Sequence, residues 1–380
     1  MKIVSQNSIT FTGKIIDSHA HIGHHEGRLY TKEHTDVFVK EPLRNKDTIE
    51  KMLVSDLDVL YSLKDEYKGN KDALILLDDK PQYVLVASCS PKNGNIENIK
   101  RFVNEYPDKI AGLKFHPTFQ NLEATQQEYD PYMKFAEEKG LACLFHTDVV
   151  IDSEGKLAKE ISKADPESVY NLAKKYKSVP VVLAHLGAGW NEAHDKAINV
   201  LVESIKNGDA NLYADISWVD IDTEIPEGGK YHPKEHVIKA IKTLKGINNP
   251  SWTYGDQSYR LMFGTDAPLG RFNIKENPAA VEAYTDFVED IKFAIRNDKD
   301  LGKDAEKIIE DLFYNNADRL YLAPLREKKR PQKKSGADKL IKISIISAIL
   351  ALLTGLGLCI SKSKDVLHRL KPVTEMMHKK

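Results

Sequence analysis

Two histidines separated by one residue follow a short apolar run near the start of the chain, in the segment KIIDSHAHIG at residues 14–23. On a β-strand successive side chains point to opposite faces, so His19 and His21 are predicted to share one face while Ala20 points away. Two neutral imidazoles that converge in this way form half of a site for zinc or a similar divalent metal. A surface histidine cluster is the alternative, because His24 and His25 follow directly.

Polar residues also end five later apolar runs, at positions equivalent to the histidine pair. They are Lys114 with His116, His146, His185, Asp215, and Asp266 preceded by Gly264-Thr265. A single histidine after a strand is more often a core residue than a ligand. Several such residues at equivalent strand ends indicate one shared site, which would supply the further ligands that the metal interpretation needs.

Eight short runs rich in Val, Ile, Leu and Phe would position these residues, each followed by a polar loop and a helical pattern. The runs are 14–21, 52–60, 83–90, 111–117, 141–147, 180–186, 211–217 and 261–266. Near-continuous apolar strands separated by amphipathic helices are typical of a parallel sheet that is buried on both faces. Eight units predict an α/β fold, a (β/α)8 TIM barrel, with its functional groups at the carboxyl ends of the strands. A last helix at 303–321, stopped by Pro324, would complete a barrel domain over residues 1–325.

Taken together, these motifs resemble the amidohydrolase superfamily of metal-dependent TIM-barrel hydrolases. Within it they are similar to the amidohydrolase-2 branch, which also holds aminocarboxymuconate-semialdehyde decarboxylase-like enzymes. The resemblance runs in order over residues 14–323 and rests on His19-x-His21, His146, His185 and Gly264-Thr265-Asp266. It implies one bound divalent metal, expected to be Zn2+, with a second ion left open. The metal ligands that it implies are His19, His21, His146 and Asp266.

The resemblance also gives roles to residues around the metal. It implies His185 as a catalytic group or as a ligand of a second metal. Lys114 stands where some members with two metals carry a carboxylated lysine, and a substrate-binding cation is the interpretation that we prefer. Three imidazoles and one carboxylate leave a position for water, whose pKa zinc can lower to about 7. Asp266 could then move the proton of that water to the leaving group, and His185 could polarise the substrate carbonyl.

Three further residues are candidates for supporting roles. Asp215 either orients a ligand histidine or acts directly. His116 and Arg271 could bind a substrate carboxylate, although a solvated loop charge is an equal interpretation for Arg271. The long loops at 22–45 and 218–232 are either lids over the site or variable surface.

Charge is distributed unevenly along the chain. Residues 326–380 carry 14 Lys and Arg against 4 Asp and Glu, whereas the preceding residues carry 41 against 52. An acidic body with a basic tail argues against nucleic acid as a partner. The three cysteines show no CxxC spacing, which argues against a disulfide framework or a thiolate metal site.

The tail itself suggests a membrane anchor. After a basic linker at 326–342, residues 343–360 hold no charge, and a helix of that length spans roughly 27 Å. The sequence therefore predicts a transmembrane helix at 343–360 and a basic C-terminal tail at 361–380. Because Lys and Arg are denser before the span, the catalytic domain is expected to be membrane-anchored and to lie in the cytoplasm. A docked apolar helix or an oligomerisation helix is the alternative, so a homo-oligomer is left open.

The sequence thus predicts an enzyme, a metal-dependent hydrolase that attacks a C–N or C–O bond of a small carbonyl substrate. One alternative is a metal-dependent non-oxidative decarboxylase, a carbon–carbon lyase in which the metal binds the substrate carboxylate. The other is a non-catalytic, membrane-tethered binding protein on the same barrel.

Overall fold

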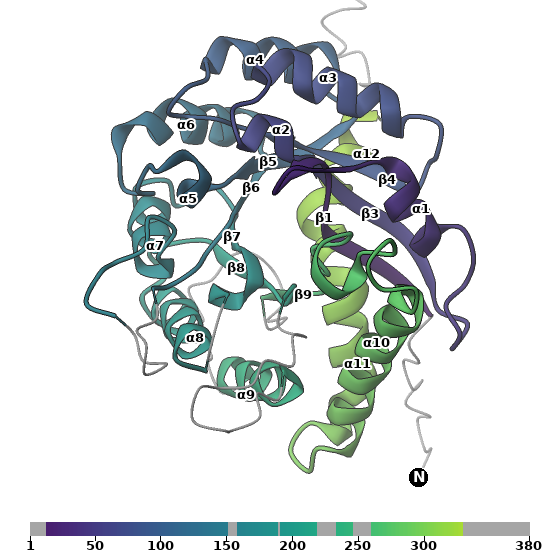
Figure 1. The fold of residues 1–380 in the computed structure, drawn as a ribbon. Coiled ribbons are helices and arrows are strands. Elements are labelled where there is room, and N and C mark those ends of the chain that lie inside the picture. The colour runs from purple at the N-terminus through teal and green to yellow at the C-terminus, as the bar shows by residue number, and fades with distance from the viewer. Residues whose placement is uncertain (1–12, 151–157, 189–190, 219–232, 246–259, 330–380) are drawn as a thin grey trace, which may run out of the picture. The chain divides into compact units, whose positions relative to one another are not determined.

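The computed structural model describes residues 13–150, 158–188, 191–218, 233–245 and 260–329, all within a compact unit over Met1–Lys329 (Figure 1). The strands are β1 (Lys14–His25), β2 (Arg28–Tyr30), β3 (Thr48–Asp56), β4 (Tyr83–Ser88), β5 (Ile110–Phe115), β6 (Ala142–Phe145), β7 (Val181–Leu183), β8 (Leu212–Asp215) and β9 (Leu261–Met262). The helices are α1 (Lys32–Val39), α2 (Leu57–Leu60), α3 (Glu66–Leu77), α4 (Ile96–Glu105), α5 (Pro117–Gln120), α6 (Asp130–Lys139), α7 (Pro166–Lys175), α8 (Asn191–Asn207), α9 (Pro233–Lys245), α10 (Ala280–Asn297), α11 (Ala305–Glu310) and α12 (Ala323–Lys329). Short 3-10 turns cover Gln127–Tyr129, Ala184–Gly187, Gly270–Phe272 and Gly302–Asp304, and two π-helical turns cover Asp311–Asn315 and Asp318–Leu322.

The strands form one sheet that closes on itself. Strands β1 and β3 to β9 pair in parallel and in chain order, and the short β2 is antiparallel to β1. Closure comes from backbone hydrogen bonds in which Ser18 N donates to Phe263 O at 3.0 Å and His21 N donates to Ala267 O at 2.7 Å. The predicted α/β barrel is confirmed, and Figure 1 shows helices packed around its strands.

Helix α6 shows why the sequence produces these elements. Pro131 occupies its first turn, where a missing N–H costs no helical hydrogen bond. Tyr132, Phe135 and Ala136 are spaced to share one face and are buried against the sheet. Gly140 ends the helix with a φ of 61°, a left-handed conformation that glycine adopts without strain.

A separate apolar cluster fills the amino-terminal end of the barrel. It joins side chains of β1, β3, β4, β6 and β7 to the C-terminal helical segment, in which Tyr321 is fully buried. A Cβ on Gly112 of β5 would lie 3.1 Å from the Tyr321 ring, so the absence of a side chain there lets the ring enter. The helical segment at residues 317–325 therefore closes the amino-terminal end of the barrel. The predicted site lies at the opposite, carboxyl end of the strands.

Two boundaries differ from the sequence prediction. Residues 57–60, predicted as part of the second strand, form α2, because the Asp56 side chain accepts a hydrogen bond from Asp58 N at 2.7 Å and caps a helix there. Pro324 does not end the chain's helical segment; it lies in the first turn of α12, which continues to Lys329. The predicted domain boundary at residue 325 remains a prediction.

The Asp56 cap carries a testable pH dependence of stability. Burial, together with the nearby charge of Asp58, raises the pKa of Asp56 to about 7. The folded chain therefore binds a proton on Asp56 more tightly than the unfolded chain does. The resulting stabilisation is fully present below the ordinary pKa of an aspartate and is lost as the pH rises towards 7. The free energy of unfolding should fall by about 4 kcal/mol over that range. We expect urea unfolding midpoints to fall between pH 5 and pH 8 and Asp56→Asn to flatten that fall. Equal slopes in Asp56→Asn and in the exposed control Asp72→Asn would contradict this.

The predicted membrane anchor is corrected. Within the described ranges, no helix is both long enough and apolar enough to cross a membrane. The 18-residue α10, for example, is amphipathic: it buries one apolar face and carries charges such as Glu282, Asp290 and Arg296. Residues 343–360, where the span was predicted, lie outside the described residues, as do residues 330–342 of the predicted linker and the tail at 361–380. The structure supports neither the transmembrane helix nor the membrane-anchored, cytoplasm-facing location predicted from it.

Candidate metal centre

Three predicted ligands meet where β1 and the segment after β9 join. His21 Nε2 lies 2.9 Å from Asp266 Oδ1, His19 Nε2 lies 3.3 Å from the same oxygen, and the two Nε2 atoms are 3.1 Å apart. All three side chains are buried, and their ligand atoms lie within 4.8 Å of one another. Three of the four predicted metal ligands therefore form one buried, compact group.

Backbone closure of the barrel brings these residues together. Asp266 N donates to His19 O at 2.8 Å, and a Cβ on Gly264 would lie only 3.0 Å from His19 Cβ. Asp17 reinforces the junction: its carboxylate accepts from Thr265 Oγ1 at 2.6 Å and from His19 N at 3.2 Å. Burial raises the pKa of Asp17 to about 6, and the hydrogen bonds limit that rise. A side chain at position 264 would therefore crowd His19 where the two ligand segments approach closely.

The Nδ1 atoms of His19 and His185 each make a hydrogen bond that orients the imidazole ring. His19 Nδ1 lies 3.0 Å from Asp215 Oδ2, and His185 Nδ1 lies 2.8 Å from Ser217 Oγ. Ser217 itself donates to Asp215, so its oxygen can accept from the His185 ring. These contacts place a proton on the Nδ1 of each ring and leave each Nε2 as a lone pair. The interpretation of Asp215 as a residue that orients ligand histidines stays a prediction, and this geometry fits it.

The ring of His21 is also oriented by a hydrogen bond at Nδ1. Its Nδ1 lies 2.9 Å from Ser55 Oγ on β3, which leaves its Nε2 facing Asp266. Burial lowers the pKa of His21 to about 4, against the opposing attraction of Asp266. Burial alone would raise the pKa of Asp266, but the neighbouring His21 and His19 outweigh it and hold that pKa below its ordinary value. The set therefore combines the neutral imidazole of His21 with an ionised carboxylate.

This donor set fits a divalent cation. Lone pairs of His19 and His21 face one another, and Asp266 Oδ1 is buried without a hydrogen-bond partner among the described residues. An unpaired buried carboxylate oxygen is costly unless a positive charge lies beside it. Two imidazoles and a carboxylate are ligands that zinc accepts.

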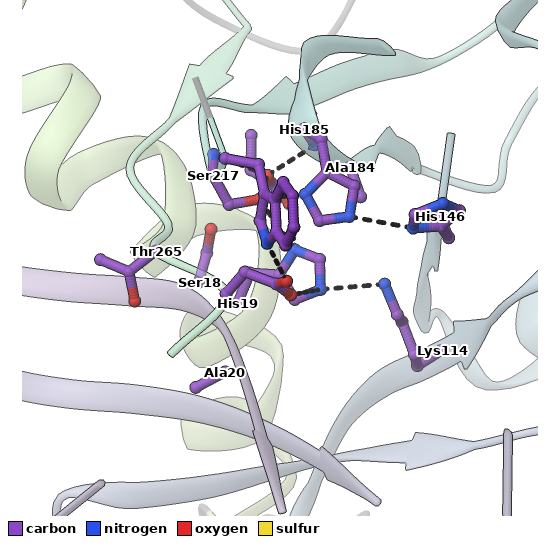
Figure 2. Close-up of polar contacts among 12 residues, drawn as sticks. Ser18, His19, Ala20, Lys114, His146, Ala184, His185, Ser217 and Thr265 are labelled. Carbon is purple, nitrogen blue, oxygen red and sulfur yellow. Dashed lines mark hydrogen bonds and ion pairs between the residues drawn. The ribbon is translucent and has the colours of Figure 1, made fainter. Parts of the chain in front are cut away.

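Lys114, His146 and His185 lie beside this group (Figure 2). Lys114 Nζ is 2.9 Å from His19 Nε2, and Figure 2 shows the lysine pointing towards that ring. His146 Nδ1 is 3.0 Å from His185 Nε2. His185 forms a second possible ligand group with His19 and Asp215, whereas His146 belongs to neither group in the described part of the chain. The structure thus brings His146 next to the centre through His185 rather than into direct contact with the first three ligands.

Electrostatics differ between the lysine and the histidines. Burial lowers the pKa of Lys114 to about 8, although the charges of Asp266 and Asp215 oppose the shift. Burial also lowers the pKa of His185 and of His146. At neutral pH the rings of His185 and His146 are therefore neutral, while Lys114 remains largely cationic.

Asp148 holds the ring of His146. Its Oδ2 lies 3.1 Å from His146 Nε2 and accepts a hydrogen bond from Thr118 Oγ1 at 2.8 Å. Burial alone would raise the pKa of Asp148, but these partners outweigh it and lower that pKa to about 2. A proton on His146 Nε2 leaves the lone pair on Nδ1, which faces His185 Nε2. We expect Asp148→Asn to weaken Zn2+ affinity by about 10- to 100-fold, measured by competition with a chelator. Thr118→Val should change it far less; equal affinities in Asp148→Asn and wild type would contradict the orienting role.

His116 and Arg271 are the other two residues predicted to bind substrate. The ring of His116 is buried and stacks on Phe119 and on His146, with centroids 3.4 and 3.8 Å away. Its Nδ1 accepts from Phe119 N at 3.3 Å. His116 therefore packs against a candidate ligand. Arg271 lies in the turn Gly270–Phe272, but its side chain lies outside what the structure describes.

Backbone strain gathers at the strand ends of the site. His185, Trp218 and Asp266 have φ values of 64°, 58° and 65°, in the left-handed region that residues other than glycine rarely adopt. Such a conformation costs about 1–3 kcal/mol and is typical of functional sites.

Four site residues were not singled out from the sequence: Ser55, Asp148, Ser217 and Trp218. Asp148 and Ser217 lie two residues after His146 and Asp215, and the two-residue period of a strand could have indicated them. Trp218 donates a hydrogen bond from Nε1 to Asp266 Oδ2, a contact between residues far apart in sequence that no local pattern signals.

Comparisons with known proteins agree with this fold. A family model described as Amidohydrolase matches residues 93–322. A solved amidohydrolase from Burkholderia multivorans with bound zinc is similar, with a TM-score of 0.53, 14% identity, and coverage of 81% of this chain and 98% of that chain. So is a structure described as a probable 2-pyrone-4,6-dicarboxylic acid hydrolase from Acinetobacter baumannii, with a TM-score of 0.50, 15% identity, and coverage of 80% and 98%. At such identities the likeness concerns the fold alone. Comparison with curated proteins gives no match.

Proposed function

The chain belongs to the amidohydrolase family, and from this premise we propose that it is a metal-dependent hydrolase that cleaves a C–N or C–O bond of a small carbonyl substrate. The observation that carries the proposal is the convergence of His19, His21 and Asp266 on one point, where Asp266 Oδ1 is buried without a hydrogen-bond partner among the described residues. In this proposal these three residues hold one divalent metal, expected to be Zn2+, and His146 completes the set. A second ion is left open.

Each residue around the metal has a distinct task in this proposal. Bound by these residues, a divalent metal would lower the pKa of water and polarise a carbonyl, which would allow hydrolysis at neutral pH. Asp266 remains ionised, so it can accept a proton from the attacking water and return it to the leaving group. His185, which is held at Nδ1 by Ser217 and contacts His146 through Nε2, would polarise the substrate carbonyl.

Lys114 favours a second candidate reaction. A fully buried cation next to the ligand set is a natural partner for a substrate carboxylate. A non-oxidative decarboxylase would use such a carboxylate contact and would need no attacking water. The same residues serve either reaction, so the products must decide between them.

A product screen tests the proposed function. Zn2+-loaded protein is incubated with small amides, esters and lactones, and in parallel with small aromatic and enoic acids while CO2 release is measured. We expect hydrolysis of at least one carbonyl substrate and its loss in Asp266→Asn. CO2 release without hydrolysis would establish the decarboxylase, and tight ligand binding without any turnover would establish a binding protein instead.

A further inference from the structure

The indole of Trp218 divides the two oxygens of the Asp266 carboxylate between different neighbours. Trp218 follows β8, and its Nε1–H donates a hydrogen bond to Asp266 Oδ2. The other oxygen, Oδ1, faces His21 and His19 at 2.9 and 3.3 Å and has no hydrogen-bond partner in the described residues. One oxygen is therefore held by the indole, while the other is presented to the histidines.

The surroundings of Trp218 hold the ring in this place. Its backbone has a φ of 58°, a conformation that a bulky residue adopts only where its surroundings demand it. The ring centroid lies 6.4 Å from that of His185 at an interplanar angle of 70°, and a Cβ on Gly270 would come within 4.0 Å of Trp218 Cζ2. The side chain is 39% exposed, so the ring reaches from solvent to the carboxylate.

We propose that Trp218 is a positioning residue that makes Asp266 bind the metal through Oδ1 alone. This inference rests on the proposed function, because it concerns the metal that Asp266 would hold there. A carboxylate can bind a metal through one oxygen or through both, and binding through both takes up a further coordination position. Holding Oδ2 keeps that position open for water or substrate, as a catalytic metal site requires.

The chemistry of indole suits this task. An indole N–H is a donor only, carries no charge and does not titrate in the working range of an enzyme. It therefore fixes Oδ2 without neutralising the carboxylate, as a lysine or arginine would do. A ring without the N–H would fill the same space but would release Oδ2.

Two variants separate the hydrogen bond from the bulk of the ring. Trp218→Phe keeps an aromatic ring and removes the donor. Trp218→Gln removes the ring but places an amide N–H at the same number of bonds from Cβ as the indole N–H. Full-length wild type and variants are stripped of metal, checked for folding by circular dichroism, and titrated with Zn2+ against a chromogenic chelator. Tryptophan emission is recorded during each titration.

We expect Trp218→Phe to lower Zn2+ affinity by about 10- to 100-fold, the usual effect of removing a partner of a metal ligand, and Trp218→Gln to recover most of it. Wild-type emission should change on Zn2+ addition, since the charge next to the indole changes, and Trp218→Phe should abolish that change. Folded Trp218→Phe with wild-type affinity, or Trp218→Gln as weak as Trp218→Phe, would overturn the role of Trp218. A wild type that binds no Zn2+ would instead overturn the proposed function itself.

Discussion

Replacing His19 and His21 together with alanine is expected to abolish metal binding and hydrolysis while the barrel remains folded. Both rings direct Nε2 at the same point, so their loss leaves Asp266 as the one member of the compact group. A metal contributes several kcal/mol to stabilising the transition state of such a reaction, so activity should fall by about a thousandfold or more. The measurements are metal content by mass spectrometry and kcat/KM for a substrate found in the screen.

The same strand offers a matched control for this double variant. His24 and His25 lie at the end of β1, but their rings contact Asp58 and Tyr61 rather than the candidate centre. Replacing both with alanine should leave metal content and kcat/KM close to wild type. Full metal content in the His19/His21 variant, or an equal loss in the His24/His25 variant, would remove the basis of the metal assignment.

Replacing Asp266 with asparagine is expected to have the second largest effect. Asparagine keeps the shape of the side chain, and its oxygen can still accept the hydrogen bond of Trp218, but the charge and the proton acceptor are lost. General acid–base groups contribute about 10²- to 10⁴-fold, so kcat at saturating Zn2+ should fall within that range. Zn2+ affinity should fall as well, because a charged ligand becomes neutral.

An exposed carboxylate controls for the loss of one negative charge. Asp286 on α10 pairs with Arg44 at the surface, so Asp286→Asn should leave both kcat and Zn2+ affinity unchanged. If metal-loaded Asp266→Asn kept more than about half of the wild-type kcat, Asp266 could not be the group that moves the proton.

Much of the fold could be predicted because burial leaves a strong local pattern. Strands covered on both faces become continuous apolar runs, and their order along the chain is their order in the sheet. The rule that groups at the carboxyl ends of barrel strands share one site was sufficient to bring His19, His21 and Asp266 together. Boundaries were less predictable: residues 57–60 are apolar enough for a strand, yet the Asp56 cap starts a helix there.

The finer geometry of the site could not be predicted, since it depends on contacts between distant segments. No local pattern indicates that Trp218 donates to Asp266, or that Ser55 of β3 holds the ring of His21. The position of His146 is a similar case. Its strand end predicts a ligand, but the ring contacts His185 and Asp148 and stands outside the compact group.

The most direct test of the central claim is the metal content of the full chain purified without added chelator. Two imidazoles and a carboxylate that converge on one point should retain a divalent cation, so we expect about one equivalent of transition metal per chain, chiefly zinc. A value below about half an equivalent, unchanged after incubation with Zn2+ and removal of the excess, would contradict a metal centre built on His19, His21 and Asp266.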